Sequence, residues 1–308
     1  MGCVVNPASI PTRFSDVCVK PETIITLQEL VVLPLLRPEY FSRGLLKRHS
    51  MSGLLLFGPP GTGKTMLAKA VAKESGCAVL EVKGSDVYNK YVGESEKMVE
   101  AIFSLARKIS PCVIFIDEVD ALFESRGNEH GNSYKRETIN QFMAEWDGLT
   151  SLKNTTTTVG SGDGGKRPTM QPIVMAATNR PFDLDDAVLR RLPRRIMVDL
   201  PNVDERAQIL SLHLKGETLG NDVDIGELAR KTENYSGSDI KNVCITAALS
   251  AVRARIRKEM LEISPEARIP DILSDSTRGR VASGTIKPEE VQELIELFHK
   301  LAKQKPAA

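Results

Sequence analysis

The chain has 308 residues, of which 41% are hydrophobic and 26% charged, and this composition is typical of a soluble globular protein. Its formal net charge of +1 gives no global electrostatic case for binding nucleic acid or an anionic membrane, and we expect no nucleic-acid partner. The five cysteines form no C-x-x-C pair, which favours a reducing, intracellular compartment over a disulfide framework.

A glycine-rich loop follows a short apolar run. Leu54 to Phe57 predict a buried strand of a parallel sheet, and helical composition follows the loop. The loop itself, "GPPGTGKT", matches the pattern G-x-x-x-x-G-K-[ST], in which backbone N–H groups and a helix N-terminus bind phosphate. Lys64 would then bridge the outer phosphates of ATP, and Thr65 would ligate Mg²⁺. The predicted nucleotide-binding residues are Gly58, Pro59, Pro60, Gly61, Thr62, Gly63, Lys64, Thr65 and Met66.

A second apolar strand, Val113 to Ile116, ends in two acidic residues. Asp117 is predicted to hold Mg²⁺ through water, and Glu118 to polarise a water for attack on the γ-phosphorus. On its own the segment would be interpreted as a core strand that happens to end in acids. The phosphate loop upstream favours the catalytic interpretation.

A flexible insertion is predicted at residues 151–172, which are rich in Thr and Gly and poor in large apolar residues. A third strand, "PIVMAATNR", follows the insertion and ends at Asn179. Asn179 is the candidate to position the attacking water, although asparagines at strand ends are also common turn residues.

Four arginines then occur within six residues: Arg190, Arg191, Arg194 and Arg195. Most charge runs are solvated surface. A role for these four groups would require a phosphate that this segment alone does not provide.

Strands and helices alternate over residues 14–200, after a short lead-in at residues 1–13, and this alternation predicts an α/β sandwich with a mostly parallel sheet. Residues 201–308 turn helical after Pro201 and predict a small helical lid domain. Its atypical C-terminal helix, in which Val291, Leu294, Ile295 and Phe298 recur at helical spacing, is expected to pack on the lid or on a neighbouring subunit.

These motifs, in this order, resemble the AAA ATPase family from about Phe14 to about Ile256. The resemblance implies a P-loop NTPase sandwich with a helical lid, hexameric ring assembly and ATP-driven remodelling. It aligns Arg190 and Arg191 with arginines that reach into the next subunit's ATP site. Arg194 and Arg195 are left as local ion pairs or surface charge.

The resemblance assigns two further nucleotide contacts. Asp16 and Val17 would contact adenine through the backbone, although Cys18 and Val19 replace the glycines usual in the family. Gly237 and Ser238 would lie near the nucleotide in a second sensor segment, where Ser236 or Ser238 also has the composition of a helix cap.

The segment "NKYVGESEK" resembles the first pore loop of protein-translocating AAA rings. The resemblance implies that Lys90, Tyr91 and Val92 grip a protein substrate, and an aromatic ring can do so with little sequence preference. The alternative is a tyrosine in an ordinary loop. Residues 125–137 would form a second pore loop.

The branch of the family resembles the meiotic clade. "WDGL", "LRRLPRR" and "FSLARKISPC" are most similar to the mitochondrial outer-membrane branch that extracts tail-anchored proteins, whereas the pore loop is more similar to spastin and katanin. We therefore expect a hexameric ATP-driven translocase that faces the cytosol at the mitochondrial outer membrane, associated through a segment absent from this chain. Microtubule severing, other remodelling, and a nucleotide-gated assembly module without translocation stay open, although Glu118 argues against the last.

Overall fold

The protein was examined as a computed structural model, in which the chain forms two compact units that are described separately below. The first comprises Met1–Pro59 and Gly63–Asp199, and the second comprises Pro60–Thr62 and Leu200–Ala308. The structure describes residues 4–41, 44, 46, 53–87, 94–123, 133–151, 171–220 and 223–263. The predicted C-terminal helix and nearly all of the predicted insertion lie outside these residues.

The first unit is built on a sheet with strand order β1-β3-β4-β5-β2-β6 in the described part of the chain. Every neighbouring pair is parallel except β1–β3, so the predicted mostly parallel sheet is confirmed. The strands are β1 (Val4–Val5), β2 (Gly53–Phe57), β3 (Ala78–Lys83), β4 (Cys112–Asp117), β5 (Ile173–Thr178) and β6 (Arg194–Met197).

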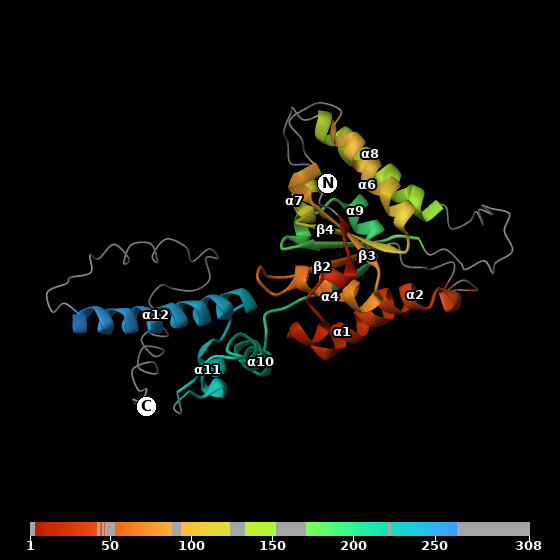
Figure 1. Ribbon diagram of the computed structural model, residues 1–308. Helices are drawn as coiled ribbons and strands as arrows, with labels where there is room; N and C mark the ends of the chain where they lie inside the picture. The colour runs from red at the N-terminus through yellow and green to blue at the C-terminus, as the bar shows by residue number, and fades with distance from the viewer. Residues whose placement is uncertain are drawn as a thin grey trace. The chain divides into compact units, whose positions relative to one another are not determined.

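Helices cover both faces of this sheet, because successive side chains of a strand point to opposite faces. In β2, Leu54 and Leu56 pack in one core cluster, whereas Leu55 packs in the other. The first face is covered by α1 (Pro21–Leu27), α2 (Leu33–Leu36) and α4 (Lys64–Ser75), and the second by α5 (Gly84–Val87), α6 (Glu94–Ile109), α7 (Val119–Phe123), α8 (Ser133–Ser151) and α9 (Asp186–Arg191) (Figure 1).

An aromatic cluster fixes α8 against its neighbours. The Phe142 ring meets Phe103, Phe123 and Trp146 edge-to-face, with centroid distances of 5.0, 5.1 and 5.9 Å. All four rings are buried, and such pairs each add about 0.5–1.5 kcal/mol beyond the area they bury. The cluster therefore fixes the position of Asp147, which follows Trp146 in the chain.

The second unit contains three described helices, α10 (Val203–His213), α11 (Ile225–Lys231) and α12 (Gly237–Ile263), as the lid prediction required. Asn202 and Glu205 form a capping box at the start of α10. The backbone N–H of Asp239 donates to Ser236 Oγ (3.3 Å), so Ser236, the first of the two predicted residues, caps α12. No helix in the described part of the chain is both long and apolar enough to cross a membrane.

Candidate nucleotide site

Three predicted site segments follow adjacent parallel strands. In the sheet, β5 lies between β4 and β2, with Phe57 opposite Thr178 and Ile116 opposite Ala176. Because parallel strands end at the same edge, the glycine loop, the acidic pair and Asn179 emerge side by side there. Ligands of open α/β sheets bind outside this carboxyl edge.

The glycine loop has a backbone that favours glycine. Gly58, Gly61 and Gly63 have φ values of 147°, 76° and 94°, which side chains of L-residues rarely allow. A Cβ on Gly58 would also lie 2.1 Å from the carbonyl oxygen of Val198, which is a steric clash. The backbone conformation of the loop therefore favours glycine at these three positions.

Gly58→Ala is expected to destabilise the fold and weaken nucleotide binding, because the new Cβ adds a backbone clash to an unfavourable φ. We expect a loss of more than about 2 kcal/mol in the free energy of unfolding, beyond the 1–2 kcal/mol typical of a strained left-handed residue. Gly76→Ala is the matched control, since Gly76 also has a positive φ (65°) but has no atom within 4 Å of its Cβ position. Equal stability of the two variants in denaturant titrations would contradict the clash.

Lys64 and Thr65 open α4 directly after this loop. The buried Lys64 ammonium donates to the carbonyl oxygens of Gly58 (3.0 Å) and Pro59 (2.7 Å), so it stays within the loop. Burial lowers the pKa of Lys64, while the charges of Asp117 and Asp120 act in the opposite direction. The partly desolvated Lys64 ammonium thus lies near two carboxylates, where phosphate oxygens of a nucleotide are expected to bind.

A hydroxyl and a carboxylate come together beside Lys64. Thr65 Oγ1 donates to Asp117 Oδ2 at 2.7 Å, although 52 residues separate them. Oxygen ligands of this kind are what Mg²⁺ prefers, and it commonly takes one or two from protein and the rest from water and phosphate. The pair therefore fits the predicted Mg²⁺ site.

Glu118 has an unusual backbone conformation. Its φ is 52°, in the left-handed region that non-glycine residues seldom adopt, and its N–H donates to Asp117 Oδ1 (3.0 Å). The side chain is exposed at the strand edge. Strained residues of this kind concentrate at functional sites.

The remaining predicted residues of the first unit lie at two places. Asn179 is exposed directly after β5. Val17 is buried, and its Cγ1 lies 3.7 Å from where a Cβ on Gly63 would be, so the predicted adenine segment lies beside the glycine loop. The Asp16 carboxylate accepts the Arg13 N–H (2.8 Å), and Met66 is 42% exposed.

Pro60, Gly61 and Thr62 belong to the second unit together with the predicted second sensor. The Ser238 N–H donates to the carbonyl oxygen of Gly61 (3.2 Å). A Cβ on Gly61 would lie 2.5 Å from Ser236 Oγ. Within the second unit, the start of α12 is thus in direct contact with Gly61, and the predicted contact of Gly237 and Ser238 with a nucleotide stays a prediction.

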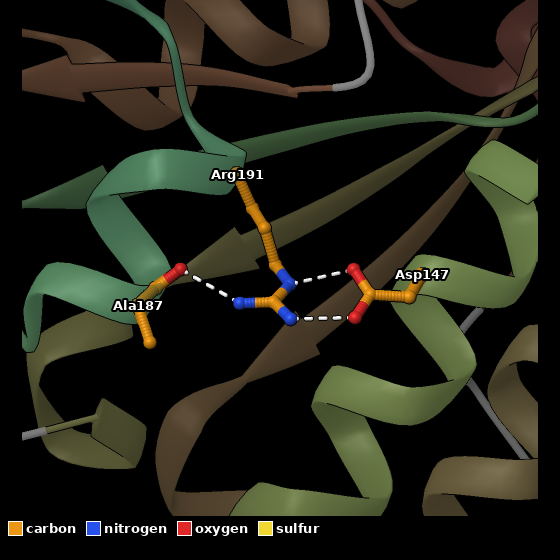
Figure 2. Close-up of polar contacts among 3 residues, drawn as sticks. All are labelled: Asp147, Ala187 and Arg191. Atoms are coloured by element: carbon orange, nitrogen blue, oxygen red, sulfur yellow. Dashed lines mark hydrogen bonds and ion pairs between the residues drawn. The ribbon is translucent and has the colours of Figure 1, made fainter.

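The four arginines have different surroundings. Arg190 is exposed and makes no ion pair or side-chain hydrogen bond with another described residue. Arg191 is held by Asp147 of α8 through two bonds, Nε–Oδ1 (2.8 Å) and Nη2–Oδ2 (2.5 Å), and donates to the Ala187 carbonyl (2.9 Å) (Figure 2). This bidentate contact raises the pKa of Arg191.

Arg194 and Arg195 are exposed on β6, and neither forms an ion pair with a residue in the described ranges. Arg195 donates to the Leu189 carbonyl at 3.3 Å. The surface-charge alternative therefore describes them better than the local acid pairs that were also considered.

Lys90, Tyr91 and Val92 lie outside the described residues, as does most of the predicted second pore loop. Two acidic residues near the site, Asp120 and Asp147, were not predicted. Asp120 lies two residues after Glu118, and Asp147 lies within "WDGL", but no local pattern shows which distant side chain each of them contacts.

Comparison with known proteins adds independent findings. Residues 54–200 match the model of the "ATPase family associated with various cellular activities (AAA)", and residues 222–264 match the AAA+ lid domain. The chain is 38% identical over 306 residues to the outer mitochondrial transmembrane helix translocase of Danio rerio, covering 99% of this chain and 74% of that protein.

Two other relatives are similar over smaller shares of their own length. The katanin p60 ATPase-containing subunit A1 of Arabidopsis thaliana is 42% identical over 244 residues, or 79% of this chain and 44% of that protein. The cell division cycle protein 48 homologue of Archaeoglobus fulgidus is 40% identical over 284 residues, or 89% of this chain and 36% of that protein.

Proposed function

The chain belongs to the AAA family and is an ATPase, and on that basis we propose that it works as a hexameric translocase that pulls protein substrates through a central pore. The observation that supports the catalytic part of this proposal is the contact of Thr65 with Asp117 beside a glycine loop and a strained Glu118. That arrangement provides separate groups for phosphate, for a divalent cation and for water.

The chain's own residues divide the chemistry among them. The loop N–H groups and Lys64 bind and orient the phosphates of ATP, and Thr65 and Asp117 hold Mg²⁺. Mg²⁺ supplies charge neutralisation for the phosphoryl oxygens. Glu118 accepts a proton from the attacking water, and Asn179 orients that water from the neighbouring strand end.

A second protomer completes the pocket in this proposal. Arg190 is exposed, and no described residue of its own chain engages its guanidinium through a side-chain bond, so it is available to a phosphate on the next protomer. Arg191 is oriented by Asp147 and would face the next protomer together with Arg190. ATP turnover per protomer should therefore rise steeply with protein concentration, as assembly completes more pockets.

The proposed substrates are mislocalised or tail-anchored membrane proteins, by analogy with the transmembrane helix translocase that matches 99% of this chain. The proposed location is the cytosolic face of the mitochondrial outer membrane. Microtubule severing is the second candidate, since a katanin subunit is 42% identical over the ATPase region. Extraction of a labelled tail-anchored protein from liposomes, measured beside microtubule severing, decides between them.

Tyr91→Ala is expected to leave ATP hydrolysis largely intact while abolishing substrate unfolding, because the aromatic ring would grip the polypeptide but take no part in the chemistry. Tyr91→Phe is the matched control and should retain unfolding, since it keeps the ring. Loss of a fluorescent substrate's fold, measured together with phosphate release, separates the two activities. Unfolding by Tyr91→Ala at the rate of the unsubstituted protein would remove the pore-loop assignment.

A further inference from the structure

The side-chain hydroxyl of Thr178, the last residue of β5, makes two hydrogen bonds. Thr178 is 1% exposed, and its Oγ1 donates to Asp120 Oδ1 at 2.6 Å. The same oxygen accepts the backbone N–H of Arg180 at 2.9 Å. Its proton and one lone pair are therefore both assigned, which fixes the hydroxyl orientation. Residue 178 donates the first bond and residue 180 donates the second. Together the two bonds therefore constrain the peptide units on both sides of Asn179.

Asp120 contacts this hydroxyl from α7, the helix that follows the neighbouring strand β4. It lies two residues after Glu118, in the first turn of α7, and α7 is anchored by its buried residues Val119, Leu122 and Phe123. The Ala121 N–H also donates to the Glu118 carbonyl (2.9 Å), which closes the turn that carries Glu118. Asp120 is thus rigidly connected to Glu118 on one side and to Thr178 on the other.

We propose that Asp120 and Thr178 are positioning residues that fix Asn179 relative to Glu118 for attack of water on ATP. The Asn179 side chain makes no hydrogen bond with another described residue, so among these residues the flanking backbone is what sets the position of Asn179. The Asp120–Thr178 bond ties that backbone to the turn bearing Glu118. This inference rests on the proposed roles of Glu118 and Asn179.

Thr178→Val tests the hydroxyl, because valine has the shape of threonine without its donor and acceptor. We expect a fall in kcat of about 10–100-fold, the scale of a small misplacement of a catalytic group, with an unchanged Kd for a fluorescent ATP analogue. Thr178→Ser keeps the hydroxyl and should recover most of kcat. A role confined to folding would lower the Tm and the analogue's affinity together in both variants.

Asp120 variants separate geometry from charge. Asp120→Asn keeps an oxygen that can accept from Thr178 but removes the negative charge near Lys64, whereas Asp120→Ala removes both. The inference predicts that Asp120→Ala resembles Thr178→Val and that Asp120→Asn is much closer to the unsubstituted protein. The double variant Asp120→Ala/Thr178→Val should lose no more than either single variant, because both break the same bond.

Asn179→Ala distinguishes failure of this inference from failure of the proposed function. If Asn179→Ala hydrolyses ATP at the normal rate, the assigned role of Asn179 is wrong and the positioning role falls with it. If Asn179→Ala is impaired while Thr178→Val and Asp120→Ala keep normal kcat, only the positioning pair is wrong. Support requires that all three lose kcat at unchanged nucleotide affinity, and that Thr178→Val costs nothing further in the Asn179→Ala background.

Discussion

Glu118→Gln is expected to bind ATP but to hydrolyse it about 10²–10⁴-fold more slowly, the usual contribution of a general base. Glutamine keeps the length and the hydrogen-bonding oxygen of the side chain but cannot accept a proton from water. Because the Glu118 side chain is exposed, the substitution should leave the packing of the fold intact. Single-turnover hydrolysis and retention of labelled ATP measure the two effects separately, and the variant should also accumulate ATP-bound assemblies.

Glu74→Gln is the control for this experiment, because Glu74 is an exposed carboxylate on α4 and its loss should change neither quantity. Turnover by Glu118→Gln at the normal rate would show that another group accepts the proton. The same variant can be examined for assembly, since trapped ATP should favour the associated state if the nucleotide is shared between protomers.

Arg190→Ala is expected to lower ATP turnover by about 10³–10⁵-fold, the range seen when an arginine that stabilises transferred phosphoryl charge is removed. Nucleotide affinity and the free energy of unfolding should barely change, because Arg190 is exposed and has no ion pair in the described part of its own chain. Arg194→Ala, on exposed β6, is the matched control and should keep normal turnover. Equal turnover of both variants would contradict the assignment of Arg190.

Arg191 differs from Arg190 because it is already paired within its own chain. Its two bonds to Asp147 join α9 to α8 across 44 residues of sequence (Figure 2). Substitution of Arg191 therefore removes an ion pair as well as any contact in trans, and a partly exposed pair of this kind contributes about 1 kcal/mol or less. Substitution of Arg190 therefore tests the proposed pocket between protomers without also removing this ion pair.

Local sequence patterns predicted the glycine loop, the acidic strand end and the helical second unit, because each depends on residues close together in the chain. Gly58, Gly61 and Gly63 have the positive φ values that a phosphate loop requires. Thr65 and Asp117 could be paired in advance only because the loop pattern and the acidic strand end each imply a Mg²⁺ ligand.

Contacts that depend on sheet order were not predictable in the same way. The pairing of Thr178 with Asp120 requires β5 to lie beside β4, and that of Arg191 with Asp147 requires α9 to lie beside α8. Hydrophobic periodicity gives the strands and helices but not their neighbours in space. For the same reason the partners of Asp120 and Asp147 could not be predicted from the sequence.

The mixing of two inactive variants tests the shared pocket most directly. Lys64→Ala lacks the phosphate-binding ammonium, and Arg190→Ala lacks the group proposed to act on a neighbour, so neither should hydrolyse ATP alone. In a mixed ring, an Arg190→Ala protomer followed by a Lys64→Ala protomer regains one complete pocket, and random mixing in equal parts places such pairs at about a quarter of the interfaces. We predict that phosphate release reappears on mixing. A mixture that native mass spectrometry shows to be co-assembled, yet that stays inactive, would contradict a pocket built from two protomers.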